Sequence, residues 1–124
     1  NDQVTCDMTR VTPRVTFTCE PGMYYTLVLF DPQAQGNTAP QPTGYGHQVS
    51  YDIPCNDNGR AQSDISAGKV FGNMAFFTPA NPQSAEHPYS WFVFEQPNGA
   101  PLAPTAEQVQ KYNYQNGNFS FDVR

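Results

Sequence analysis

Hydrophobic and polar residues alternate with a period of two along several segments of the chain, which is the pattern of half-buried β-strands. The alternating segments are residues 4–8, 15–19, 47–53 and 119–123. Residues 24–30 and 89–95 are instead almost continuously apolar, as are central strands that are covered on both faces. A shorter apolar piece occupies residues 74–77. We therefore predict a chain made mainly of β-strands.

The alternation also predicts which side chains share a face. In residues 47–53, Val49, Tyr51 and Ile53 occupy every second position, so we expect them to point to the same side of the strand. Residues 60–72 are ambiguous, although residues 66–68, Ser-Ala-Gly, suggest a turn.

Segments rich in proline, glycine and polar residues separate the strands and predict turns and loops. The longest of these segments are residues 33–46, 78–86 and 96–104. One helix is predicted over residues 105–112, because Thr105 suits its start, Glu107 its first turn and Lys111 its end. Residues 1–124 are thus expected to form a single domain, an antiparallel all-β sandwich with one short C-terminal helix.

The charge balance narrows the range of partners. Six Lys and Arg residues stand against eleven Asp and Glu residues, for a formal net charge of -5 at pH 7. Binding to nucleic acid usually requires a basic patch, so we expect no nucleic-acid partner. No apolar run has the length that a transmembrane helix needs, so we do not expect a transmembrane protein.

Three cysteines allow one disulfide within the chain. If the chain turns at residues 12–13, Thr-Pro, the alternation places Cys6 opposite Cys19. We predict a disulfide between these two, while the alternative is that both are small buried hydrophobes. Cys55 is then left over, either buried or bonded to a partner molecule.

The chain also carries a glycosylation signal. Residues 118–120, Asn-Phe-Ser, are an N-glycosylation sequon, which is meaningful only on a secretory route. The sequon predicts a glycan on Asn118. Together with the low lysine content and the predicted disulfide, it predicts a secreted, extracellular protein.

Four motifs follow one another in an order that resembles the phosphatidylethanolamine-binding protein family. Residues 25–32, Tyr-Thr-Leu-Val-Leu-Phe-Asp-Pro, are similar to a central strand of the family that runs into its Asp-Pro-Asp-x-Pro motif. Residues 65–68 resemble the segment after the next strand pair. Residues 87–89 and 91–96 resemble the family's Gly-x-His-Arg motif and the strand that follows it. The resemblance extends from about residue 13 to the end of the chain.

The resemblance implies a Greek-key β-sandwich with a small anion-binding pocket at one end. Members of the family bind lipid headgroups, modulate signalling or inhibit proteases. Carried over position by position, the resemblance implies that the pocket is lined by Asp31, His47, His87 and Tyr89, with Tyr45 and Pro82 at its rim. It implies no cofactor.

The motifs depart from the family at three positions that bear on the pocket. Gln33 stands where the second aspartate of Asp-Pro-Asp-x-Pro is expected, and Gln35 stands where its last proline is expected. Pro88 takes the place of the arginine that follows the motif histidine, which removes a fixed cation. These three departures therefore weaken the inference about the ligand more than the inference about the fold.

Three kinds of chemistry suit two histidines and an aspartate. Imidazole N–H groups and a tyrosine hydroxyl can donate to the oxygens of a phosphate or a carboxylate. The same residue types can hold Fe, Zn or Cu, but no local spacing of ligands supports a metal. Neither Ser84 nor Ser90 lies in a nucleophile-elbow pattern, so we expect no enzyme. The remaining alternative is that both histidines only satisfy buried backbone groups.

We therefore predict a soluble extracellular binding protein for a small anionic or amphiphilic ligand of the phospholipid-headgroup type. The first alternative is an extracellular structural or interaction module that kept the fold, lost the ligand and contacts a partner protein through Cys55 or the acidic surface. A protease inhibitor is a further alternative, although no reactive loop is recognisable in the sequence.

Overall fold

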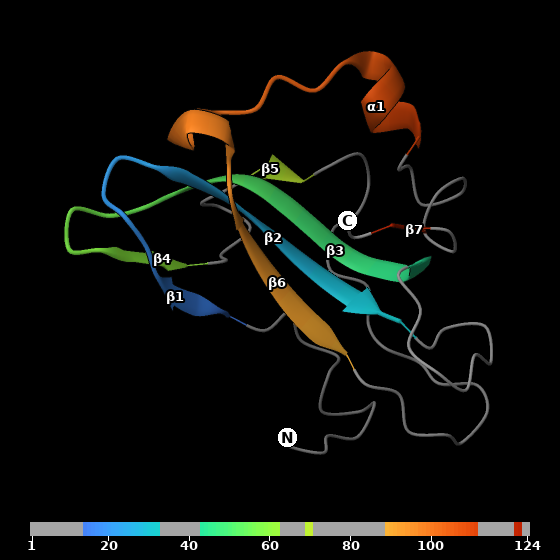
Figure 1. Cartoon of the computed structure of the whole chain (residues 1–124), viewed down its shortest axis with the longest axis horizontal. Coiled ribbons are helices and arrows are strands. Elements are labelled where there is room, and N and C mark those ends of the chain that lie inside the picture. Colours follow the sequence, from blue (N-terminus) through green and yellow to red (C-terminus); the bar gives the residue numbers. More distant parts are fainter. Residues whose placement is uncertain (1–13, 33–42, 63–68, 71–88, 112–120, 123–124) are drawn as a thin grey trace.

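The computed structural model describes residues 14–32, 43–62, 69–70, 89–111 and 121–122. They form two antiparallel sheets and two short helices (Figure 1). The five-stranded main sheet has the order β5 (Lys69–Val70), β3 (Thr43–Pro54), β2 (Tyr24–Asp31) and β6 (Ser90–Glu95), and β7 (Phe121–Asp122) pairs with β3. The small sheet pairs β1 (Thr16–Thr18) with β4 (Arg60–Gln62), and the helices are η3 (Pro97–Gly99) and α1 (Ala106–Lys111).

The hydrophobic core lies between the two sheets. Leu27 on β2, Ile53 on β3 and Ala61 on β4 are almost completely buried and form its centre. The side chains packed around them are Val15, Phe17, Cys19 and Trp91. We call the face of the main sheet that carries Leu27 the inner face, and the other the outer face. The predicted fold class, all-β and antiparallel with one short helix, is confirmed.

Most predicted elements appear close to their expected limits, but β3 is longer than predicted. It begins at Thr43, inside the segment 33–46 that its composition predicted to be a loop. The ambiguous residues 60–72 contain β4 and β5. The strand predicted over residues 4–8, the short apolar piece 74–77 and the loop 78–86 lie outside the described residues. Within the described part of the chain, no helix has the length and apolar character needed to cross a membrane.

Two β-bulges interrupt the pairing of β2 with β3, and they correct one prediction. Val49 lies opposite Val28 on the outer face, whereas Ile53 lies opposite Tyr25 on the inner face. The prediction that Val49 and Ile53 share a face is therefore wrong. The cause is Asp52, whose φ of 55° lies in the left-handed region and accompanies an extra residue that reverses the alternation.

The disulfide joins Cys19 to Cys55, with their Cα atoms 5.9 Å apart, so the predicted bond between Cys6 and Cys19 is wrong. Two backbone contacts between turns explain this pairing. Cys19 N–H donates to Gly59 O at 2.9 Å, and Cys55 N–H donates to Met23 O at 3.0 Å. The turns after β1 and after β3 thus hold the two cysteines together. Cys55 is therefore not available as a free thiol for a partner protein.

Gly99 ends η3 in a conformation that requires glycine. Its φ is 62°, and a Cβ atom built there would collide with the side chain of Met23. Gly22 also has a positive φ, of 84°, but an added Cβ would meet nothing within 4 Å. Comparing an alanine substitution at Gly22 with one at Gly99 therefore separates the free-energy cost of backbone strain from that of a steric collision.

We expect Gly99→Ala to lower the free energy of unfolding by about 3 kcal/mol, because it adds a buried collision to the strain of a left-handed alanine. Gly22→Ala, which adds only the strain, should lower it by about 1 kcal/mol. Urea unfolding followed by circular dichroism measures both values. Equal losses in the two variants would contradict the close approach of Gly99 to Met23.

Candidate ligand-binding site

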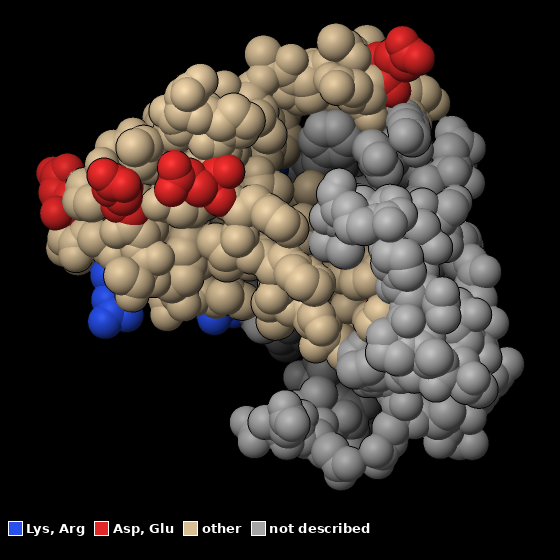
Figure 2. Space-filling view, viewed as in Figure 1, with Lys and Arg blue, Asp and Glu red and all other residues tan. Residues whose placement is uncertain are grey.

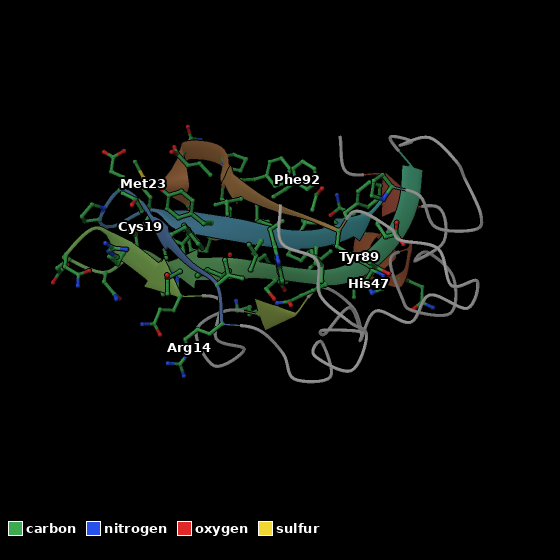
Figure 3. The ribbon with its side chains drawn as sticks, turned by 90° about the horizontal axis from the view of Figure 1, so that it is seen from below. Arg14, Cys19, Met23, His47, Tyr89 and Phe92 are labelled. Atoms are coloured by element: carbon green, nitrogen blue, oxygen red, sulfur yellow. A yellow bond between two sulfur atoms is a disulfide. The ribbon has the colours of Figure 1, made fainter. Side chains whose placement is uncertain are left out.

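Three of the predicted site residues lie at one end of the main sheet, on its three adjacent strands. Asp31 is the last residue of β2, His47 lies in β3, and Tyr89 immediately precedes β6. Figure 3 shows His47 and Tyr89 at the end of the sheet away from Cys19 and Met23. Because β3 and β6 both run antiparallel to β2, the end of β2 lies beside the beginnings of β3 and β6. Residues far apart in the sequence therefore meet at this end of the sheet.

The second bulge between β2 and β3 positions His47. Gln48 lies opposite Leu29 and Gly46 lies opposite Phe30, so His47 is the extra residue between them. Bulges of this kind are common next to functional sites, because they redirect a side chain out of the regular alternation. The imidazole of His47 meets the ring of Tyr89 edge to face, with the ring centroids 5.1 Å apart and the planes at 70°.

The polar side chains at this sheet end are buried, although strand ends usually lie at the surface. Asp31 is 3% exposed and His47 is 5% exposed, while Tyr89 is half-buried. Burying polar groups costs free energy unless they are hydrogen-bonded or paired, so such groups are retained where they have a structural or functional role. The three side chains supply an imidazole, a carboxylate and a phenol to one small region.

The structure therefore brings Asp31, His47 and Tyr89 to one sheet end. The backbone of Tyr45 lies opposite Asp31 in the β2–β3 ladder. His87 and Pro82 lie outside the described residues, so their place at the site stays a prediction, as does the ligand-binding role of all six residues. Among the described residues, no three His, Cys, Asp or Glu side chains form a group that could hold a metal ion.

Gln48 is a buried polar residue beside this site that the sequence analysis did not single out. It is 1% exposed, and its Nε2 donates to Ser50 Oγ at 2.9 Å. Its Oε1 has no hydrogen-bond partner within the described part of the chain. Its opposite residue on β2 is Leu29, two positions from Asp31. The sequence carried no signal for this burial, because the alternation groups Gln48 with the polar residues Ser50 and Asp52.

A second polar cluster, which we call the Asp52 clasp, lies toward the other end of the main sheet. Asp52 N–H donates to Gln96 Oε1 at 2.8 Å, and Gln96 Nε2 donates back to Asp52 Oδ1 at 3.0 Å. Leu102 N–H donates to Asp52 Oδ1 at 2.8 Å, and Lys69 Nζ lies 3.1 Å from Asp52 Oδ2. The clasp connects β3, β5, the end of β6 and the segment after η3.

The clasp alters the acidity of both charged partners. Burial raises the pKa of Asp52, but the Leu102 N–H, the Gln96 amide and the Lys69 ammonium together outweigh burial and hold it below the ordinary value of 3.8. The hydrogen bond to Asp52 and its negative charge raise the pKa of Lys69. Asp52 is therefore a carboxylate at neutral pH, and the sequence analysis missed its role.

Buried polar side chains at converging strand ends can form a site for a small ligand, but the fold alone does not define the function. Comparison with protein families identifies the group. The model of the phosphatidylethanolamine-binding protein family matches residues 2–123, so the chain belongs to that family. No solved structure matches the chain significantly. Family membership supports a small-ligand binding protein as the kind of function.

Proposed function

We propose that this chain is an extracellular protein that binds a small anionic ligand of the phospholipid-headgroup type and does not catalyse its conversion. The observation that carries the proposal is the placement of buried Asp31 and His47, with Tyr89 against the imidazole, at one end of the main sheet. Family membership supports it.

The donors at this site suit an oxyanion. The imidazole of His47 and the hydroxyl of Tyr89 can donate to phosphate oxygens, and protonated histidine forms the stronger, charge-assisted bond. The carboxylate of Asp31 repels an anion unless it orients a histidine or shares a proton. Because Pro88 replaces the family's arginine, the proposal assigns the positive charge at the site to histidine. Anion binding should therefore depend on pH.

The extracellular setting is supported by covalent chemistry. Disulfides persist in oxidising compartments and are rare in the reducing cytosol, so the Cys19–Cys55 bond favours secretion. The sequon at Asn118 agrees with a secretory route. We propose binding without catalysis because no serine of the chain lies in a nucleophile-elbow pattern.

We expect phosphate and phosphorylethanolamine to bind more tightly at pH 5.5 than at pH 7.5, since histidine gains its charge as pH falls through roughly 6.5. At pH 5.5, His47→Gln should weaken binding by about tenfold or more, the loss of one charge-assisted hydrogen bond. Isothermal titration calorimetry at both pH values measures these affinities.

Arg60→Gln is the matched control, because it removes one positive charge from an exposed position on the small sheet. It should leave both affinities unchanged. Tyr89→Phe tests the hydroxyl separately, since it keeps the ring that contacts His47. If the unmodified chain binds neither ligand, or if His47→Gln binds as well as it does, the interaction-module alternative replaces this proposal.

A further inference from the structure

Within the described part of the chain, strand β6 forms one edge of the main sheet. In the sheet order β5-β3-β2-β6, the only neighbour of β6 among the described residues is β2. Figure 1 shows β6 on the side of β2 that faces away from β3. Two of its large apolar side chains are exposed, Val93 by 41% and Phe94 by 42%. Exposure on both faces of an edge strand is unusual, because natural edges are normally protected.

The register shows which backbone groups of β6 face outward. Gln96 N–H donates to Tyr24 O at 3.0 Å, which makes these two residues a hydrogen-bonded pair. Hydrogen-bonded and non-hydrogen-bonded pairs alternate along an antiparallel ladder, and the β2–β6 ladder contains no bulge. Phe94 and Phe92 therefore direct their backbone groups toward β2.

The intervening residues Trp91, Val93 and Glu95 consequently direct their N–H and C=O groups away from β2. These groups form a row of donors and acceptors spaced two residues apart, which is the template that another antiparallel strand recognises. Residues 90–95 contain no lysine and no proline, the two residue types that most often block such an edge.

The side chains of β6 are apolar along the same edge. Phe92 and Phe94 stack on the outer face with centroids 6.2 Å apart, and Phe92 also meets Phe30 edge to face at 6.5 Å. Figure 2 shows the surface over β6 as uncharged on this side, apart from acidic side chains near one end of the strand. Glu95 is the one charged residue within β6. The edge thus offers both backbone partners and an apolar surface.

We propose that β6 pairs with β6 of a second copy of this chain, antiparallel, about a two-fold axis at Val93. This register places Val93 opposite Val93, Phe92 opposite Phe94, and Trp91 opposite Glu95 of the other copy. The outward groups of Trp91, Val93 and Glu95 then form hydrogen-bonded pairs across the axis. The two main sheets become one continuous sheet.

The sequence of β6 favours a copy of itself as the occupant. Phe92 of each copy faces Phe94 of the other across the axis, and such aromatic cross-strand pairs are favourable. Glu95 faces an indole instead of the other Glu95, from which it is separated by four residues along the strand, about 14 Å. That distance exceeds the screening length of roughly 8 Å at physiological ionic strength. The net charge of -5 on each copy predicts that salt strengthens the association.

Charge substitution at the axis tests the proposal on the full-length chain. Val93→Lys places two ammonium groups opposite each other, and Val93→Glu places two carboxylates there. We expect each variant alone to raise the dimer Kd at least about tenfold, and an equimolar mixture of the two to restore a 1:1 dimer. Sedimentation equilibrium over a range of concentrations measures the Kd values. Thr16→Lys and Thr16→Glu are matched controls at an exposed position on the small sheet, and each should leave the dimer Kd unchanged.

Amide hydrogen exchange on the unmodified chain provides a second measurement that does not depend on the folding of a variant. The N–H groups of Val93 and Glu95 should become more protected as protein concentration rises, whereas that of Phe94 should not change. The proposal is overturned if the unmodified chain stays monomeric up to about 1 mM, far above the Kd of a specific dimer. It is also overturned if folded Val93 variants dimerise normally or fail to pair when mixed, or if protection at Val93 is independent of concentration.

Discussion

Asp52→Ala is expected to lower the free energy of unfolding by about 3 kcal/mol, because it leaves two N–H groups without their acceptor. One N–H of the Gln96 amide and the Leu102 N–H both lose their acceptor, while Gln96 Nε2 keeps its bond to Ala100 O at 2.8 Å. The substitution also leaves alanine in a left-handed conformation that aspartate tolerates better. Urea unfolding at pH 7 measures the loss.

Acid should remove much of this contribution from the unmodified chain. The pKa of Asp52 is lower in the folded protein than its ordinary value of 3.8, so the unfolded chain binds the proton more readily. The stability that the carboxylate contributes is therefore fully present above the unfolded pKa, and it is lost as pH falls through the folded pKa. The difference in unfolding free energy between the unmodified chain and Asp52→Asn should shrink as the pH is lowered from 6 toward 3.

Two controls separate the buried clasp from surface electrostatics. Lys69 is 66% exposed in its side chain, so Lys69→Met should change stability at pH 7 by no more than about 1 kcal/mol. Asp57 is exposed in the turn after β3, and Asp57→Ala should have an effect within about 0.5 kcal/mol. A loss in Asp52→Ala no larger than in Asp57→Ala would mean that the clasp does not stabilise the fold.

Local pattern was sufficient to predict that β2 and β6 are strands. Only β2 is buried on both faces as predicted, because exposing its apolar run costs free energy in proportion to its area. The prediction of a covered core strand is wrong for β6, which is an edge strand of the described sheet with exposed residues. The antiparallel class was predicted, but the pairing of β2 with β6 was not, because the two strands lie far apart in the sequence. The limits of β3 were less predictable, because among the described residues Thr43 and Gly44 pair with β7, a strand distant in sequence.

The alternation in β3 was misleading because it assumed a strand without bulges. Asp52 interrupts the period of two, and nothing in the local sequence marks the extra residue. What holds it is the clasp to Gln96, 44 positions away. Because the partner that stabilises this bulge is distant in sequence, the local hydrophobic pattern does not predict the bulge.

The candidate site was predictable for a different reason. Asp31, His47 and Tyr89 were identified by the order of family motifs, and the strand register then placed them at one sheet end. Neither the bulge that positions His47 nor the burial of Gln48 could be read from those motifs. Both depend on how β2 and β3 pair, which is a property of the ladder and not of either strand alone.

Removing the disulfide should be the most destabilising covalent change. The Cys19–Cys55 bond closes a loop with a sequence separation of 36, and restricting that loop in the unfolded chain is worth about 4 kcal/mol at 25 °C. We expect the double variant Cys19→Ala/Cys55→Ala to lose about that much unfolding free energy, a large share of the roughly 5–15 kcal/mol of a typical domain. Alanine suits both positions, because Cys55 is 8% exposed beside the core.

The assignment of the bond and its energetic effect can be tested together. Urea unfolding with and without reductant should show the loss in the unmodified chain and no further loss in the double variant. Cys6→Ala should behave like the unmodified chain, since it leaves Cys19 and Cys55 in place. Non-reducing peptide mapping of folded protein should recover residue 19 linked to residue 55. A peptide linking residue 6 to residue 19, or reductant sensitivity that disappears in Cys6→Ala, would show that Cys19 is bonded to Cys6 instead of Cys55.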